Sequence, residues 1–305
     1  MMTHWTESLI PFQRGRTAIV TGTGGLGYRT AQALAASGAR VIIAGRNADK
    51  GAAAVQRIRS EVPQSLVDFA LLDLASLSSI SQFCRRLQDT HGCVDLLINN
   101  AAVMAPPQRC STEDGFELQF GTNYLGHFAL TAQLLPLLRA ATQPRVVTVS
   151  SVAARSGKIS FEDLQSEHAY RPMSAYAQSK LACLLFSIEL QRRSQAMGWN
   201  IRSIGAHPGV SRTDLIANGA GAQSAAGLLR RYFWFLFQPV EQGALPILYA
   251  ATAEEAEAGA YYGPDKLGET RGFPAPARVP RQALDRGVAE RLWQVSEQLA
   301  GVRFT

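Results

Sequence analysis

One tyrosine and one lysine, four residues apart, are the side chains in this chain best suited to exchanging protons. They are Tyr176 and Lys180, in the stretch SAYAQSKLA. If residues 174–195 form a helix, the i, i+4 spacing places phenol and ammonium on one face. A tyrosine ordinarily loses its proton near pH ~10, and a nearby positive charge lowers that pKa. The pair is therefore a candidate general acid/base. The alternative is an ordinary solvated helix face, because such faces often carry a tyrosine and a lysine at the same spacing. Other parts of the chain must decide between a catalytic pair and a solvated face.

A glycine-rich stretch near the N-terminus has the composition of a nucleotide-binding turn. The β-branched run Thr17–Val20 leads into TGTGGLG, and a helical pattern follows from Leu26 to Ser37. Strand, glycine turn and helix in this order are typical of a dinucleotide-binding unit, in which missing Cβ atoms let a pyrophosphate approach the helix N-terminus. An ordinary turn is the alternative. We expect cofactor contacts from Gly22, Thr23, Gly24, Gly25, Leu26 and Gly27.

The end of a second predicted strand, Arg40–Ala44, bears on which cofactor binds. An acidic residue there would favour NAD by bonding the adenosine ribose. This chain instead has Gly45, Arg46 and Asn47. A guanidinium suits a 2′-phosphate, which it can bind through two hydrogen bonds. We expect Arg46 and Asn47 to contact the cofactor and NADP(H) to be preferred, with NAD(H) possible. A solvated arginine is the alternative.

The remaining chain alternates strand-like and helical segments without a compositional break. This alternation predicts an α/β fold, a Rossmann-type doubly wound parallel sheet with helices on both faces. We expect a single domain over residues 1–305. The predicted strands are Phe69–Leu74, Val94–Ala102, Arg145–Ser151, Asn200–Gly209 and Ala260–Pro264, and the predicted helices are Ser76–His91, Thr112–Ala140, Leu181–Met197, Val240–Ala251 and Ala283–Leu299.

Charge and composition exclude several classes of function. The net charge of +6 comes from scattered arginines, so we expect no nucleic-acid binding. The five histidines and four cysteines lack the spacing of a metal site, and we expect no metal. His127 is expected to pack in a helix interface. The N-terminus lacks a signal-peptide pattern and no apolar run approaches the ~20 residues of a membrane span, so we expect a soluble, cytoplasmic protein.

One late segment is a candidate for binding the substrate. Residues 214–239 begin with small residues and end with the aromatic cluster Tyr232–Phe237, which suggests a lid over an apolar ligand. A helix packed on the core or in a subunit interface is the alternative, and peripheral membrane contact through the aromatic cluster is also possible. The C-terminal tail, residues 265–305, is expected to wrap the surface before the final helix.

Several motifs in sequence order resemble those of the short-chain dehydrogenase/reductase family. They are TGTGGLG, DL at Asp73–Leu74, NNAA at Asn99–Ala102, TNYLGHF around Asn123, VSS ending at Ser151, YAQSK, and HPGVSRT ending at Thr213. The resemblance covers nearly the whole chain. The long insert between Ser151 and Tyr176, and the late ERLWQVSEQL stretch, are most similar to the retinol dehydrogenase branch.

The resemblance implies a role for each matching residue. Tyr176 would be the general acid in reduction and the base in oxidation, while Lys180 would lower its pKa and bind the nicotinamide ribose. Ser151 would hydrogen-bond the substrate carbonyl oxygen, and Asn123 would help hold a water between Lys180 and solvent. Cofactor contacts would also come from Asp73, Leu74, Asn100, Ala101, Pro208, Gly209 and Thr213.

Two positions depart from the family pattern. The glycine turn is one residue shorter, because only Thr23 and Gly24 separate Gly22 from Gly25. The usual final glycine of Asn-Asn-Ala-Gly is Ala102. The first change leaves open which backbone amides meet which phosphate, and the second could tighten the loop beside the nicotinamide.

The sequence thus favours an NADP(H)-dependent oxidoreductase that interconverts a carbonyl and an alcohol on a small apolar substrate. A non-catalytic NADP(H) sensor or interaction protein is the alternative. Ser151 as a hydrolase nucleophile is disfavoured, since no G-x-S-x-G elbow surrounds it. The helices carrying Asn123 and Tyr176 are long and apolar, and the family that the chain resembles commonly pairs them across a two-fold axis. We therefore expect a homodimer or homotetramer.

Overall fold

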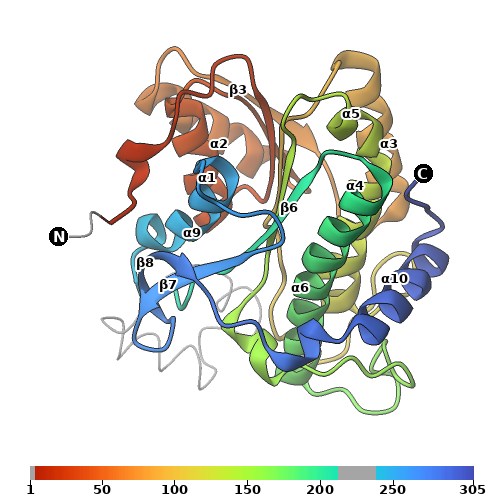
Figure 1. Cartoon of the computed structure of the whole chain (residues 1–305). Coiled ribbons are helices and arrows are strands. Elements are labelled where there is room, and N and C mark those ends of the chain that lie inside the picture. Colours follow the sequence, from red (N-terminus) through yellow and green to blue (C-terminus); the bar gives the residue numbers. More distant parts are fainter. Residues whose placement is uncertain (1–3, 212–237) are drawn as a thin grey trace.

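A central eight-stranded sheet organises the chain, as Figure 1 shows for the computed structural model, which describes residues 4–211 and 238–305. The strand order is β3-β2-β1-β4-β5-β6-β7-β8. All neighbouring pairs are parallel except β7 and β8. The strands are β1 Thr17–Thr21, β2 Arg40–Gly45, β3 Leu66–Leu71, β4 Leu96–Asn99, β5 Arg145–Val149, β6 Arg202–Ala206, β7 Tyr261–Lys266 and β8 Arg271–Pro276.

Helices cover both faces of the sheet, which confirms the doubly wound α/β prediction (Figure 1). The central strands are buried from both sides, and this explains their nearly continuous apolar runs, such as the fully buried β5. One apolar core lies under α1 Gly25–Ala36, α2 Ala48–Glu61 and α9 Val240–Thr252. The other lies under α3 Leu77–Thr90, α4 Gly126–Gln133, α6 Pro172–Met197 and α10 Arg286–Ala300.

The strand order reverses at β1, which pairs with β2 on one side and β4 on the other. In open parallel sheets, ligands bind outside the carboxyl ends of the strands at such a point. Here the glycine turn leaves β1, and the loop that starts at Asn100 leaves β4. The fold therefore brings the two expected cofactor-binding segments to the same crevice.

The segment 112–140 is not the single long helix expected from its pattern. It starts as a tight hairpin, in which Ser111 pairs with Glu117 and the Thr112 hydroxyl accepts the Phe116 amide at 3.1 Å. A π-helical turn η2 over Phe120–Leu125 follows, then α4, then a short α5 over Leu135–Arg139. Pro136 lacks an amide proton, so the α4 hydrogen-bond pattern cannot continue through it.

The C-terminal tail is more ordered than expected. Residues Arg271–Pro276 form an additional strand, β8, antiparallel to β7 at the edge of the sheet. Pro274 and Pro276 are tolerated there because an edge strand bonds a neighbour on one side only. The 3-10 turn η5 over Arg281–Leu284 leads into α10, whose first turn is capped by Asp285, with Val288 N donating at 3.0 Å. The prediction of a tail that wraps the surface was thus incomplete, because it lacked strand β8.

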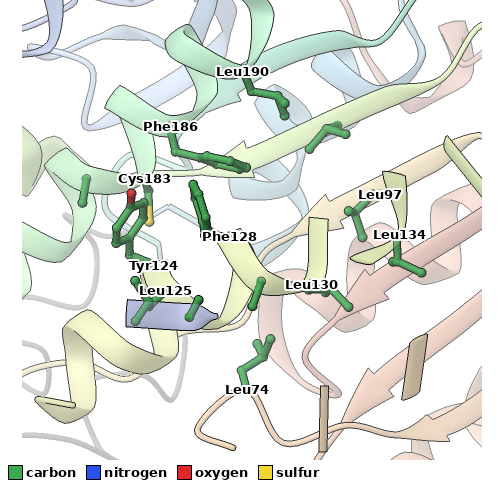
Figure 2. Packing of buried hydrophobic residues seen from close by; sticks show 14 of the residues in the cluster. Leu74, Leu97, Tyr124, Leu125, Phe128, Leu130, Leu134, Cys183, Phe186 and Leu190 are labelled. Atoms are coloured by element: carbon green, nitrogen blue, oxygen red, sulfur yellow. The ribbon is translucent and has the colours of Figure 1, made fainter. Parts of the chain in front are cut away.

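Helix α10 covers the apolar sides of α4 and α6. The indole of Trp293 is buried and lies 5.0 Å from the Phe128 ring, centroid to centroid. Figure 2 shows Tyr124 and Phe128 directed toward Phe186 of α6. The Tyr124 hydroxyl bonds Ser296 of α10 at 2.6 Å. The chain itself therefore buries much of the apolar helix surface from which the sequence predicted a subunit interface.

No helix within the described part of the chain combines the length and apolar content that crossing a bilayer requires.

Trp293→Ala tests the contribution of this helix contact to stability. Removing a fully buried indole leaves a cavity, so the free energy of unfolding should fall by about 3–5 kcal/mol. Gln294→Ala, on the exposed side of the same helix, is the matched control and should change it by less than about 0.5 kcal/mol. Urea unfolding followed by circular dichroism measures both. Equal small effects would mean that α10 is only loosely attached.

Candidate functional site

The shortened glycine turn still closes tightly against the helix that follows it. Gly22 and Gly25 adopt positive φ angles of 100° and 52°, and α1 begins at Gly25 with Gly24 as its N-cap. A Cβ on Gly27 would overlap the Gly22 carbonyl oxygen, whereas one on Gly24 would meet nothing within 4 Å. Gly27 therefore serves the packing of the turn, and Gly24 leaves open space at a helix N-terminus.

A cavity of about 580 Å³ lies beside this turn. Its walls include the backbone of Gly22–Leu26, the loop Asn100–Ala102 and one face of α2. Lys50 and Arg57 supply positive charge from that face. Backbone amides at a helix N-terminus with two cationic side chains nearby form a suitable environment for phosphate groups. Sequence reasoning missed Arg57, although its seven-residue spacing from Lys50 places both on one side of α2.

A second cavity, of about 310 Å³, contains three of the four expected catalytic side chains, and Asn123 is not part of its lining. Leu26, Asn100 and Ala102 line both cavities, so the two adjoin. The structure thus brings the Tyr/Lys pair to the same crevice as the glycine turn. The second cavity's polar lining includes Ser151, Tyr176 and Lys180, with Pro208 and Gly209 beside them, and its apolar lining includes Met104, Val152, Met173 and Val210.

Tyr176 and Lys180 lie one turn apart on α6, and both are buried. Burial disfavours the phenolate and raises the pKa of Tyr176 to about 12, while a hydrogen bond with the Ser151 side chain partly opposes that rise. Burial also lowers the pKa of Lys180. Its ammonium donates to the Val149 carbonyl at 2.9 Å and lies 6.0 Å from the centre of the Tyr176 ring. Burial is thus the largest influence on the Tyr176 pKa in this arrangement, and the lowering expected from Lys180 stays a prediction.

Ser151 directly follows β5 and starts the 3-10 turn η3, Val152–Ser156. Its hydroxyl oxygen accepts the Ala153 amide at 3.2 Å, which fixes the side chain at the edge of the cavity. The hydroxyl proton is left to interact with Tyr176 or with a ligand in the cavity. The serine and the tyrosine thus form a pair of hydroxyl donors.

Asn123 lies in η2 and is committed to protein contacts. Its side-chain oxygen accepts the Val103 amide at 2.7 Å, and its side-chain nitrogen donates to the Val103 carbonyl and to the Ser179 hydroxyl. Its backbone carbonyl accepts from the Cys183 thiol and the His127 ring. These contacts hold the loop after β4, and the water-holding role of Asn123 stays a prediction.

Several expected cofactor residues lie outside the two cavities. Arg46 is exposed at the end of β2 and makes no hydrogen bond or ion pair within the described part of the chain. The Asn47 side chain caps α2 by accepting the Lys50 amide at 2.8 Å. Asp73 accepts the Ala75 amide at 2.9 Å, and Leu74 is buried. Thr213 and nearly all of the expected lid, residues 214–239, lie outside the described residues.

Sequence reasoning also missed a charged network that contacts the Pro208–Gly209 wall of the catalytic cavity. Glu269, in the β7–β8 hairpin, pairs with Arg155 at 2.6 Å and with His207 Nε2 at 3.0 Å. Because the Gly209 amide donates to His207 Nδ1, Nε2 carries the proton that points to the carboxylate. Burial lowers the pKa of His207 despite Glu269. The network joins the turn after Ser151 to the Pro208–Gly209 wall, and only the fold brings its members together.

Within residues 4–211 and 238–305, no group of three or more His, Cys, Asp or Glu side chains has the arrangement of a metal site.

Comparisons with known proteins agree with the geometry. The family model for short chain dehydrogenases matches residues 16–223. Retinol dehydrogenase 13 of Mus musculus is 44% identical over 294 residues, covering 94% of this chain and 84% of that protein. Polyprenol dehydrogenase of Mus musculus is 42% identical over 300 residues, covering 96% and 86%. A crystal structure of an uncharacterised protein from Mycobacterium paratuberculosis has 41% identity and a TM-score of 0.82, covering 99% of this chain and 100% of that one.

A matching family model, relatives above 40% identity and a shared fold all agree with the hydroxyl pair and glycine turn described above. The chain belongs to the short-chain dehydrogenase/reductase family, in its retinol dehydrogenase branch, and is an NAD(P)-dependent oxidoreductase acting on alcohols or carbonyls.

Proposed function

We propose that the chain is an NADP(H)-dependent enzyme that interconverts a carbonyl and an alcohol on an apolar substrate, with Tyr176 as general acid/base. The observation that carries this proposal is the meeting of Ser151, Tyr176 and Lys180 in one cavity that adjoins the glycine turn. The first cavity suits a dinucleotide phosphate, and the second suits a reacting carbonyl.

Each side chain of the catalytic cavity has a separate role in the proposed reaction. When bound, the nicotinamide ring supplies or accepts the hydride at the substrate carbon. In reduction, the Ser151 hydroxyl donates a hydrogen bond to the carbonyl oxygen, and the Tyr176 O–H bond breaks as its proton moves to that oxygen. The raised pKa keeps Tyr176 protonated and ready to donate at neutral pH. Lys180, buried one turn away, would bind the nicotinamide ribose, and its charge would stabilise the phenolate that remains.

The substrate we propose is a long, apolar aldehyde, ketone or alcohol. Met104, Val152, Met173 and Val210 line the catalytic cavity and offer no charge to a polar substrate. Met173 is about half exposed, so the cavity has an apolar side at its margin. Retinol and polyprenol, in the names of the two relatives, are alcohols of this kind. The segment 214–239 is proposed as the lid over this ligand.

We propose NADP(H) rather than NAD(H) as the preferred cofactor. No carboxylate directly follows β2, where ribose discrimination occurs, and Arg46 has no partner within the described part of the chain. Lys50 adds positive charge to the adjoining cavity wall. NAD(H) stays possible, because the shortened turn alters the approach of the phosphates.

A non-catalytic NADP(H) sensor is the alternative. A sensor would have no use for a serine, tyrosine and lysine gathered in one cavity, and this set favours the enzyme. The homodimer or homotetramer expected from the sequence stays a prediction. Because α10 covers much of the α4 and α6 surface, an assembly would use other faces as well.

Gly24→Ala and Gly27→Ala separate cofactor contact from turn packing. Gly24 has an extended backbone and free space around a new Cβ, so Gly24→Ala should fold normally and lose NADPH affinity. Gly27→Ala should lower stability as well, because its Cβ would overlap the Gly22 carbonyl. Thermal unfolding and NADPH fluorescence titration measure the two effects. If Gly24→Ala binds NADPH like wild type, the cavity is not the phosphate site.

Tyr176→Phe tests the proton donor. It keeps the ring and removes the acid, so turnover should fall at least ~10²-fold while NADPH still binds. Steady-state rates and cofactor titration are the measurements. Undiminished turnover would contradict the mechanism.

The pH profile checks the same residue without mutation. Since burial raises the pKa of Tyr176, reduction should stay nearly constant around neutral pH, whereas alcohol oxidation should accelerate as the pH rises and more phenolate forms. The Phe variant should lose this rise. An oxidation rate that falls from neutral to alkaline pH would exclude Tyr176 as the base.

Arg46→Ala tests cofactor choice. If Arg46 binds the 2′-phosphate, NADPH affinity should fall about ten- to hundredfold, the scale of a charged hydrogen bond of ~1.5–3 kcal/mol. NADH affinity should barely change. Arg85→Ala, on a helix of the opposite sheet face, makes the same charge change and should leave both affinities unaltered. Equal losses for both cofactors, or a wild-type preference for NADH, would show that Arg46 is a surface charge.

A further inference from the structure

His127 of α4 is completely buried, and the mechanism above does not use it. Both ring nitrogens nevertheless have polar partners. Nδ1 lies 2.9 Å from the Asn123 carbonyl oxygen, and Nε2 lies 2.9 Å from the Thr21 hydroxyl. Thr21 ends β1 directly before the glycine turn, so the ring connects η2 to the start of the cofactor crevice.

The partners determine where the protons lie. A carbonyl oxygen only accepts, so Nδ1 must carry a proton. Burial lowers the pKa of His127 to about 4, which leaves the ring neutral and Nε2 without a proton at neutral pH. The single Thr21 hydroxyl proton has two acceptors within reach, Nε2 at 2.9 Å and the Ile98 carbonyl oxygen at 3.2 Å, and an unprotonated Nε2 is the nearer one. Its oxygen is left to accept, and it receives the amides of Asn100 and Ala101, each at 2.9 Å.

The loop Asn100–Val103 is consequently held at both ends. Its first two amides bond the Thr21 hydroxyl, and the Asn100 side chain donates to the Thr21 carbonyl at 2.7 Å. At the other end, the Asn123 side chain holds both backbone groups of Val103. His127 is bonded to Thr21 and to Asn123, so it joins the two attachments.

This loop is a shared wall of the crevice. Asn100 and Ala102 line both the phosphate cavity and the catalytic cavity. A shift of the loop would therefore alter cofactor position and the space at the reacting carbon together. An apolar ring or chain in place of the imidazole could fill the same volume, but it would leave the Thr21 proton only the more distant Ile98 carbonyl oxygen, at 3.2 Å, as an acceptor.

We propose that His127 is a positioning residue, which orients the Thr21 hydroxyl and couples it to Asn123 so that the loop Asn100–Val103 is set for the nicotinamide cofactor. The part that concerns the cofactor rests on the proposed function. The hydrogen-bond relay itself, Thr21–His127–Asn123, is a property of the protein without ligand and can be tested separately.

A double-mutant cycle tests the relay. His127→Leu removes the ring, and Thr21→Val removes the hydroxyl at nearly constant volume. Each should raise the NADPH dissociation constant about tenfold and accelerate amide hydrogen exchange at Asn100 and Ala101. Because both changes break one relay, the double variant should be little worse than either single one. His127→Gln offers an amide near the former Nε2 and should recover part of the loss.

Tyr124→Phe is the matched control. It removes a buried hydrogen bond, to Ser296, from the same π-helical turn that carries Asn123, on the side facing α10. It should lower stability without changing NADPH affinity or exchange at Asn100 and Ala101. A His127→Leu variant that behaves like this control would reduce His127 to a packing residue.

Nitrogen-15 spectra of the imidazole give a readout independent of cofactor and activity. The proposal requires a neutral ring protonated at Nδ1 that does not titrate near pH 6.5. Additive losses in the cycle, or a ring protonated at Nε2, would overturn it. If wild type binds neither NADPH nor NADH, the proposed function fails, while the exchange and imidazole measurements still decide the relay.

Discussion

The parallel pairing of β1, β4, β5 and β6 is the constraint on which the site depends, because it brings four strand ends to one edge of the sheet. The glycine turn follows β1, the loop at Asn100 follows β4, Ser151 follows β5, and Pro208 follows β6. Strand pairing alone does not position these segments to atomic accuracy. Hydrogen bonds between the segments fix their positions. The most important are those from the Asn100 and Ala101 amides to the Thr21 hydroxyl, and that from the Val103 amide to the Asn123 side chain.

Burial sets the charges in this crevice. It raises the pKa of Tyr176 and lowers those of Lys180 and His127, so neutral forms are favoured at the tyrosine and the histidine. The buried ammonium of Lys180 is stabilised by the hydrogen bond that it donates to the Val149 carbonyl. A protonated tyrosine beside Ser151 is prepared to donate to a carbonyl oxygen, which is the requirement of the reductive direction. An oxidised nicotinamide carries positive charge, and its binding would favour the phenolate that oxidation requires.

The sequence was sufficient for the fold class, for the helix that carries Tyr176 and Lys180, and for the family. These depend on local periodicity and on motifs that lie close together in the chain. It failed where distant segments decide the outcome. Residues 112–140 break into a hairpin and three helical pieces because Ser111 pairs with Glu117 and Pro136 interrupts the helix. Strand β8 needed β7 as its partner. The Glu269 network joins three loops that are unrelated in sequence. His127, expected to pack, also carries two hydrogen bonds that no local pattern indicates.

We propose that this crevice transfers a hydride between NADPH and a carbonyl carbon. The most direct test uses NADPH carrying deuterium at the transferring C4 position, with a panel of long apolar aldehydes and ketones that includes retinal. Mass spectrometry of the products reads the result. We expect an alcohol with one deuterium on its hydroxyl-bearing carbon. Tight cofactor binding without any labelled alcohol across the panel would contradict it and favour a sensor.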